Sequence, residues 1–168
     1  MLGPRSIILY GPAGTGKTWR ASAEFERPLR ITGNCIETLR DVVLDGPRAT
    51  THLVFDEFDY TVTHILRPHM GGPLTLMYPQ SAGKNAKALS VEACLTLFNM
   101  QDPGTIEARY GNVYVPPLPR LFLTNKQPHE LMPQNCSDAQ QAGLRRRYQT
   151  IHVTQRIWDT PPPPPGNM

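Results

Sequence analysis

Short apolar runs, each about the length of a strand, recur along this chain. Runs of this kind between turn signals are typical of strands buried in a sheet. They lie at residues 5–10, 29–32, 52–56, 120–124 and 149–154. The last run alternates apolar and polar residues, as expected of a strand with one exposed face.

Segments with a helical spacing of apolar residues separate these runs. The predicted helices cover residues 17–26, 36–44, 89–100 and 137–144. The second rests on apolar residues at positions 36, 39, 43 and 44, and the fourth begins at Ser137, a residue type that caps helices. Alternation of strands and helices predicts an α/β fold with a mainly parallel central sheet flanked by helices.

One short segment breaks this alternation. Residues 105–110 and 113–115 are both strand-like, and Gly111 and Asn112 lie between them. A glycine–asparagine pair between two strands is a turn signal, so a β-hairpin is predicted here.

Two further segments show no strand or helix pattern and are predicted to be irregular. Residues 60–88 are rich in glycine, proline and polar side chains, and a loop of this length in a compact domain is usually functional or mobile. Five prolines open residues 161–168, which predicts an extended or disordered tail. We therefore expect one domain over residues 1–155 and a proline-rich tail over residues 156–168.

Composition narrows the setting of the protein more than its function. The net charge of +3 permits nucleic-acid binding but does not argue for it. Cys35, Cys94 and Cys136 lie far apart, which favours reduced thiols over a disulfide framework or a zinc site. No apolar run approaches the ~20 residues that cross a bilayer, and the first residues lack the apolar core of a signal peptide. We expect a nuclear or cytoplasmic protein that is not secreted.

The most specific pattern follows the first apolar run directly. It has the spacing G-x-x-x-x-G-K-T and comprises Gly11, Pro12, Ala13, Gly14, Thr15, Gly16, Lys17 and Thr18. Glycines permit the close backbone approach that phosphate needs, and the loop N–H groups with the following helix start hold the anion. In this pattern Lys17 reaches the β- and γ-phosphates and Thr18 ligates Mg²⁺. The alternative, a chance glycine turn, does not explain the lysine–threonine ending after a strand.

A second pattern is the apolar run that ends in Asp56 and Glu57. In a nucleotide-hydrolysing protein, an acid at such a strand end holds Mg²⁺, commonly through water. The next acid orients and polarises the attacking water. The alternative is that both acids only solvate the end of the strand.

A third buried run, residues 121–124, ends in Asn125. An amide at this place can contact both the γ-phosphate and the attacking water, which is the sensor role in many oligomeric ATPases. A turn asparagine before Pro128 is the alternative. Further on, Arg145, Arg146 and Arg147 could supply a cation to a neighbouring subunit's γ-phosphate, with Arg145 and Arg146 preferred. The alternative is a solvated helix end, where cations favour the negative dipole.

With these three motifs in this order, the chain resembles the superfamily 3 helicases, AAA+-type hexameric ATPases of small DNA and RNA viruses. It looks most like the helicase domain of replication initiator (Rep) proteins of circular single-stranded DNA viruses. Residues 11–18 match its Walker A motif, 53–57 its Walker B motif and 121–125 its motif C. The resemblance spans residues 5–154 and implies a P-loop NTPase fold of AAA+ type in a host nucleus or cytoplasm.

The family's pore hairpin corresponds to the segment around Arg109, Tyr110 and Asn112, which the resemblance implies as the DNA-contacting residues. The basic residue that the family usually carries near the hairpin tip is missing, because residues 115–119 read Val-Pro-Pro-Leu-Pro. The family's N-terminal endonuclease motifs and the small oligomerisation segment are also missing. We expect either one part of a larger replication protein or a stand-alone ATPase.

The resemblance implies an ATP- and Mg²⁺-dependent motor that assembles as a homo-oligomeric ring, a hexamer as in this family. The ring would move on single-stranded or forked DNA. Three alternatives stay open. They are an RNA virus helicase of the same superfamily, a P-loop small-molecule kinase, and a nucleotide-binding remnant without motor activity. The acid pair and Asn125 argue against the kinase.

Overall fold

A computed structural model describes residues 5–32, 35–58, 89–108, 111–131, 133 and 136–156. Five parallel strands form its central sheet in the order β2-β3-β6-β1-β7. They are β1 (Ser6–Tyr10), β2 (Pro28–Thr32), β3 (His52–Asp56), β6 (Arg120–Thr124) and β7 (Tyr148–His152). The predicted α/β class with a mainly parallel sheet is confirmed. The predicted loop at 60–88 and the tail at 161–168 lie outside the described residues.

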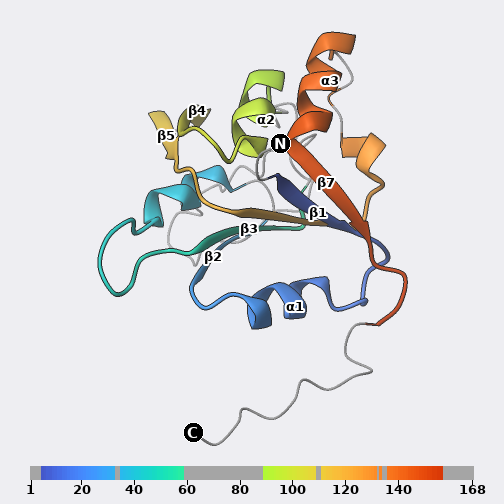
Figure 1. Ribbon diagram of the computed structural model, residues 1–168, viewed down its shortest axis with the longest axis horizontal. Coiled ribbons are helices and arrows are strands. Elements are labelled where there is room, and N and C mark those ends of the chain that lie inside the picture. Colours follow the sequence, from blue (N-terminus) through green and yellow to red (C-terminus); the bar gives the residue numbers. More distant parts are fainter. Residues whose placement is uncertain are drawn as a thin grey trace, which may run out of the picture.

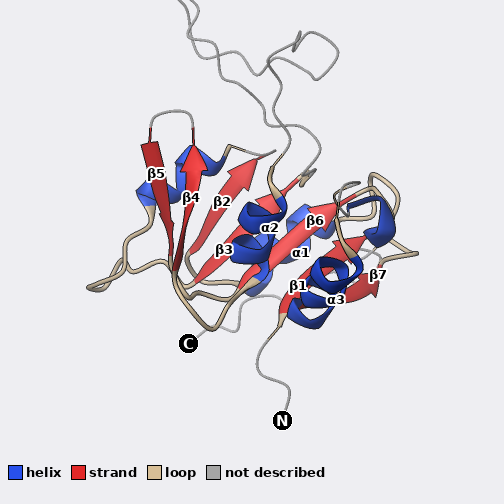
Figure 2. Cartoon of the chain, turned by 90° about the horizontal axis from the view of Figure 1, so that it is seen from above, coloured by secondary structure: helices blue, strands red, loops and turns tan. Residues whose placement is uncertain are grey.

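Helices cover both faces of this sheet. Helix α1 (Lys17–Glu24) lies on one face, and α2 (Val91–Phe98) and α3 (Asp138–Arg147) lie on the other (Figure 1). The hairpin of β4 (Gly104–Ala108) and β5 (Gly111–Val115) forms a separate two-stranded sheet on the α2 side of the central sheet (Figure 1, Figure 2). There β4 contacts α2, and β5 contacts the 3-10 helix Ile36–Asp41. Two short 3-10 helices, Ile36–Asp41 and Pro128–Leu131, complete the elements of the described residues.

The alternation of side chains along the strands divides the core into two parts. Leu121 and Leu123 of β6 pack with Ala21 on the α1 face. Phe122 points to the other face, where its ring stacks on Phe55 with centroids 4.6 Å apart. All five residues of β6 are buried, because this strand has a neighbour on each side and helices on both faces.

Two predictions of local structure were wrong. Residues 36–44 do not form an amphipathic α-helix, because the segment is a 3-10 helix that ends at Asp41. Ile36 and Leu39 stand three residues apart and are both buried, which suits the three-residue turn of a 3-10 helix. Val43 and Leu44, which completed the predicted stripe, are exposed.

The hairpin turn was also misplaced. Gly111 pairs with Ala108, and Asn112 pairs with Glu107, so both residues belong to β5 and not to the turn. The connection runs through residues 109–110, which lie outside the described residues. The remaining differences are shifts of a few residues at element ends, where assignment is least certain from local sequence.

Candidate functional site

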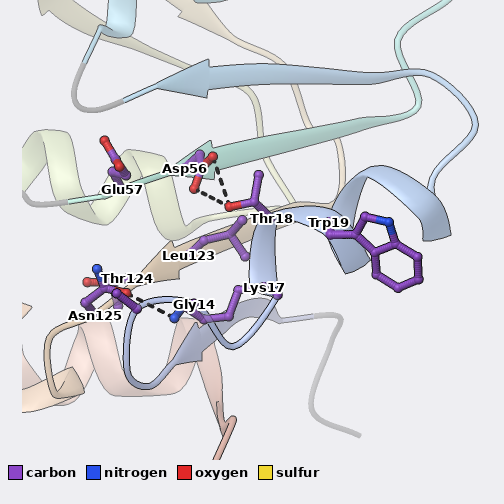
Figure 3. A pocket seen from close by; sticks show the side chains of 11 residues that line it. Gly14, Lys17, Thr18, Trp19, Asp56, Glu57, Leu123, Thr124 and Asn125 are labelled. Carbon is purple, nitrogen blue, oxygen red and sulfur yellow. Dashed lines mark hydrogen bonds between the residues drawn. The ribbon is translucent and has the colours of Figure 1, made fainter. Parts of the chain in front are cut away.

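The carboxyl ends of three neighbouring strands meet at one edge of the sheet. The glycine-rich loop, residues 11–18, follows β1; Asp56 ends β3; and Asn125 follows β6. Because β6 lies between β1 and β3 and all are parallel, these residues converge. They border a cavity of about 480 Å³ (Figure 3). Its lining residues are Ala13, Gly14, Gly16, Lys17, Thr18, Trp19, Asp56, Glu57, Leu123, Thr124 and Asn125.

Two glycines shape the loop at its ends. A Cβ atom on Gly11 would lie 2.2 Å from the carbonyl oxygen of Val153, and its φ is 153°, so no side chain fits there. Gly16 precedes α1 with φ 85°, in the left-handed region that favours glycine. The loop therefore turns sharply from β1 into α1, and the amino end of that helix faces the cavity.

Lys17, the first residue of α1, has its ammonium group inside the loop. Its Nζ donates to the carbonyl oxygens of Gly11 at 2.9 Å and Pro12 at 2.8 Å. It also contacts the hydroxyl of Thr15 at 3.2 Å and Oδ1 of Asn125 at 3.0 Å (Figure 3). Burial lowers the pKa of Lys17, and the nearby carboxylate of Asp56 opposes part of that shift. All four partners of the ammonium are neutral groups, so an anion bound in the cavity could replace them as the partner of Lys17.

Thr18 and Asp56 form the pair that could hold a cation. The Thr18 hydroxyl donates to the carboxylate oxygens of Asp56 at 3.0 and 3.2 Å. Mg²⁺ is commonly held by one or two such oxygen donors, with waters and phosphate oxygens completing its shell. The described residues contain no cluster of three or more His, Cys, Asp and Glu side chains that would form an all-protein metal cage. The donor set fits Mg²⁺ that arrives with a phosphate ligand.

Glu57 lies beside this pair but differs from it in backbone and exposure. Its φ is 55°, and it has the one positive φ of a non-glycine residue in the described part of the chain. Such a conformation costs about 1–3 kcal/mol. The turn buries Phe58 in the core, while the exposed Glu57 lines the cavity and points away from Thr18 (Figure 3). A carboxylate held there can accept a proton or orient water near a bound phosphate.

The structure adds two residues that the sequence analysis missed. Arg30 of β2 donates to Oδ2 of Asp56. The contact between Arg30 and Asp56 could not be predicted, because the sequence does not reveal that β2 pairs with β3. Trp19 follows Thr18 directly, lines the cavity and is 41% exposed. The available signal in the sequence was a tryptophan directly after the motif.

The arginines near residue 146 do not belong to this cavity. Arg145 and Arg146 are exposed in the last turn of α3, and Tyr148, which follows, pairs with Ser6 at the start of β1. The glycine-rich loop follows the other end of β1, a strand about 13 Å long at ~3.3 Å per residue. These arginines therefore lie at the opposite edge of the sheet from the cavity of their own chain.

Of the three predicted DNA-contacting residues, the structure describes Asn112. Asn112 is an exposed residue of β5 that does not line the cavity. Arg109 and Tyr110 lie outside the described residues.

Comparison with known proteins gives this site no relative. No protein-family model matches the chain, and no curated protein matches it significantly. Among the described residues, no helix has the length and apolar character to cross a membrane.

Proposed function

We propose that this chain is a P-loop NTPase of AAA+ type that binds ATP with Mg²⁺ and hydrolyses it. The observation that carries the proposal is the convergence of Lys17, Thr18, Asp56, Glu57 and Asn125 on one cavity from the ends of three adjacent strands. A chance glycine turn would not bring a lysine, a hydroxyl–carboxylate pair and an amide together in this way.

Each side chain has a distinct task in the proposed reaction. The loop N–H groups and Lys17 bind the β- and γ-phosphates, and Thr18 and Asp56 hold Mg²⁺. Bound Mg²⁺ would neutralise charge on the phosphate oxygens. Glu57 orients the attacking water and accepts its proton. Phosphate binding takes Lys17 away from Asn125, and the freed amide can then contact the γ-phosphate and the water.

The position of the arginines supports a ring in which each site lies between two subunits. Arg145 and Arg146 lie at the far edge of the sheet from their own cavity. A γ-phosphate contact by either of them therefore requires a second copy of the chain. An arginine supplied in this way stabilises the charge that develops during phosphoryl transfer.

We further propose that the ring is a hexameric motor of superfamily 3 type that moves on single-stranded or forked DNA during replication. The order and spacing of the three motifs support this assignment. The β4–β5 hairpin, with Asn112 exposed on β5, is the element proposed to contact the DNA. Aromatic and basic side chains there would hold the strand by stacking and charge.

The decisive experiment measures ATP hydrolysis against protein concentration, with and without single-stranded DNA. A ring motor gives turnover that rises more than linearly with protein, responds to DNA and disappears in Glu57→Gln. Matched single-stranded RNA separates a DNA motor from an RNA motor. Turnover that is linear in protein and indifferent to nucleic acid would contradict the ring motor, and retained turnover in Lys17→Ala would contradict the ATP site itself.

A further inference from the structure

Arg30 forms an ion pair inside the proposed metal site. Its guanidinium donates to Oδ2 of Asp56, the same carboxylate that accepts from the Thr18 hydroxyl. The Asp56 side chain is only 6% exposed, whereas that of Arg30 is 51% exposed. A buried carboxylate without a partner is costly. Arg30 supplies a positive charge in direct contact with Asp56, and the ammonium of Lys17 adds a longer-range attraction.

The register of the sheet explains why this arginine reaches Asp56. Strand β2 is the edge strand beside β3, and Thr32 is the direct partner of Asp56. Arg30 precedes Thr32 by two positions, so both side chains leave β2 on the same face as Asp56. Its long side chain then extends along the strand to the carboxylate.

The two oxygens of Asp56 are both engaged in this arrangement. Thr18 contacts both of them, and Arg30 occupies Oδ2. A divalent cation next to Thr18 would meet a carboxylate whose charge is already balanced. It would also meet the repulsion of the guanidinium, which is strong at such short range in a partly buried site. Of the two partners, half-exposed Arg30 can leave for water, whereas buried Asp56 cannot.

We propose that Arg30 is an internal counter-ion of Asp56 that a divalent cation displaces when it enters with nucleotide. This inference rests on the proposed ATP site. Arg30 is a positioning residue in this scheme: it balances Asp56 while the site is empty of metal, and it raises the Mg²⁺ concentration that nucleotide binding requires. The site therefore favours metal that arrives together with the negative charge of a phosphate chain.

The test measures binding of a non-hydrolysable ATP analogue to the full chain by calorimetry over a series of Mg²⁺ concentrations. Arg30→Met should lower the Mg²⁺ concentration for half-maximal binding by roughly threefold to tenfold, since it removes one competing charge. Arg30→Lys, which keeps the charge, should stay close to the wild type. Arg27→Met is the matched control, because Arg27 pairs with Glu26 and the carbonyl of Ala49 instead of Asp56.

A second measurement, thermal unfolding in EDTA, needs no nucleotide. Arg30→Met should lower the melting temperature, and this loss should vanish in an Asp56→Asn background, where no charge needs balancing. A loss that persists there means that Arg30 only packs, which overturns the proposal.

The binding data separate the remaining outcomes. An unchanged or higher Mg²⁺ requirement in Arg30→Met, with nucleotide still bound, overturns the counter-ion exchange and leaves the ATP site standing. A wild-type chain that binds no nucleotide at any Mg²⁺ concentration overturns the proposed function, and the exchange with it.

Discussion

Arg120, at the start of β6, offers the sharpest test of how the core supports the site. Arg120 is only 3% exposed. Its guanidinium donates to three backbone carbonyl oxygens, those of Thr96 (2.7 Å), Pro116 (2.7 Å) and Leu97. Two of these carbonyls lie in the last turn of α2, where a helix runs short of internal donors. The carbonyl of Thr96 also accepts from the backbone N–H of Asn99 at 3.2 Å, and that of Pro116 accepts from Leu118 at 2.8 Å. Arg120 therefore ties α2 and the end of the hairpin to the strand that leads to Asn125.

The expected cost of losing this side chain follows from those bonds. Burial lowers the pKa of Arg120 to about 10, so the group is still charged at neutral pH. A hydrogen bond to a charged group contributes about 1.5–3 kcal/mol, and a buried acceptor left without a partner costs about 1–3 kcal/mol. The carbonyls of Thr96 and Pro116 would each keep one backbone donor, which limits the cost of losing the guanidinium. Arg120→Leu should lower the free energy of unfolding by about 3–5 kcal/mol, a large part of the 5–15 kcal/mol typical of a domain.

Urea unfolding followed by circular dichroism measures this quantity. The midpoint should fall at an unchanged slope, since the surface exposed on unfolding is similar. Arg20→Leu is the control, because Arg20 makes an exposed pair with Glu24 on α1 and should change stability by less than about 0.5 kcal/mol. If Arg120→Leu remained within about 1 kcal/mol of the wild type, the carbonyls would not depend on Arg120, and this reasoning would be refuted.

Three further predictions concern the site and its support. Lys17→Ala should weaken nucleotide binding and lower the hydrolysis rate by about 10²-fold or more, because it removes a group that stabilises the charge developing in the transition state. Calorimetry measures the binding, and a phosphate-release assay measures the hydrolysis. Gly11→Ala should abolish nucleotide binding, because its Cβ would overlap the carbonyl of Val153. Gly14→Ala is the control and should only strain the loop, because a Cβ there meets no atom within 4 Å. Equal nucleotide binding by both variants would contradict this. Burial lowers the pKa of His52, so the unfolded chain takes up a proton at a higher pH than the folded one, and stability should fall as the pH drops below about 6.5. His52→Phe should flatten that part of the pH profile of the melting temperature.

The local sequence was enough to locate most elements and the motif residues. Strands β1, β3 and β6 were predicted because each is an apolar run with a turn signal after it, and burial on both faces demands such runs. The α-helix predicted at 36–44 was wrong, because two of the apolar residues on which it rested are exposed. Periodicity alone does not distinguish an α-helix from a shorter 3-10 helix.

The sequence by itself determined the chemistry of the site: the glycine-rich loop, the acids that end one run and the asparagine that ends another. These signals are local, since a loop conformation or a strand end depends on residues close in the chain. Only the tertiary structure decided which groups meet. The pairing of β2 with β3 brings Arg30 to Asp56, and the insertion of β6 between β1 and β3 brings Asn125 to Lys17. Such contacts depend on the order of strands in the sheet, which many residues far apart in the chain set together through their packing.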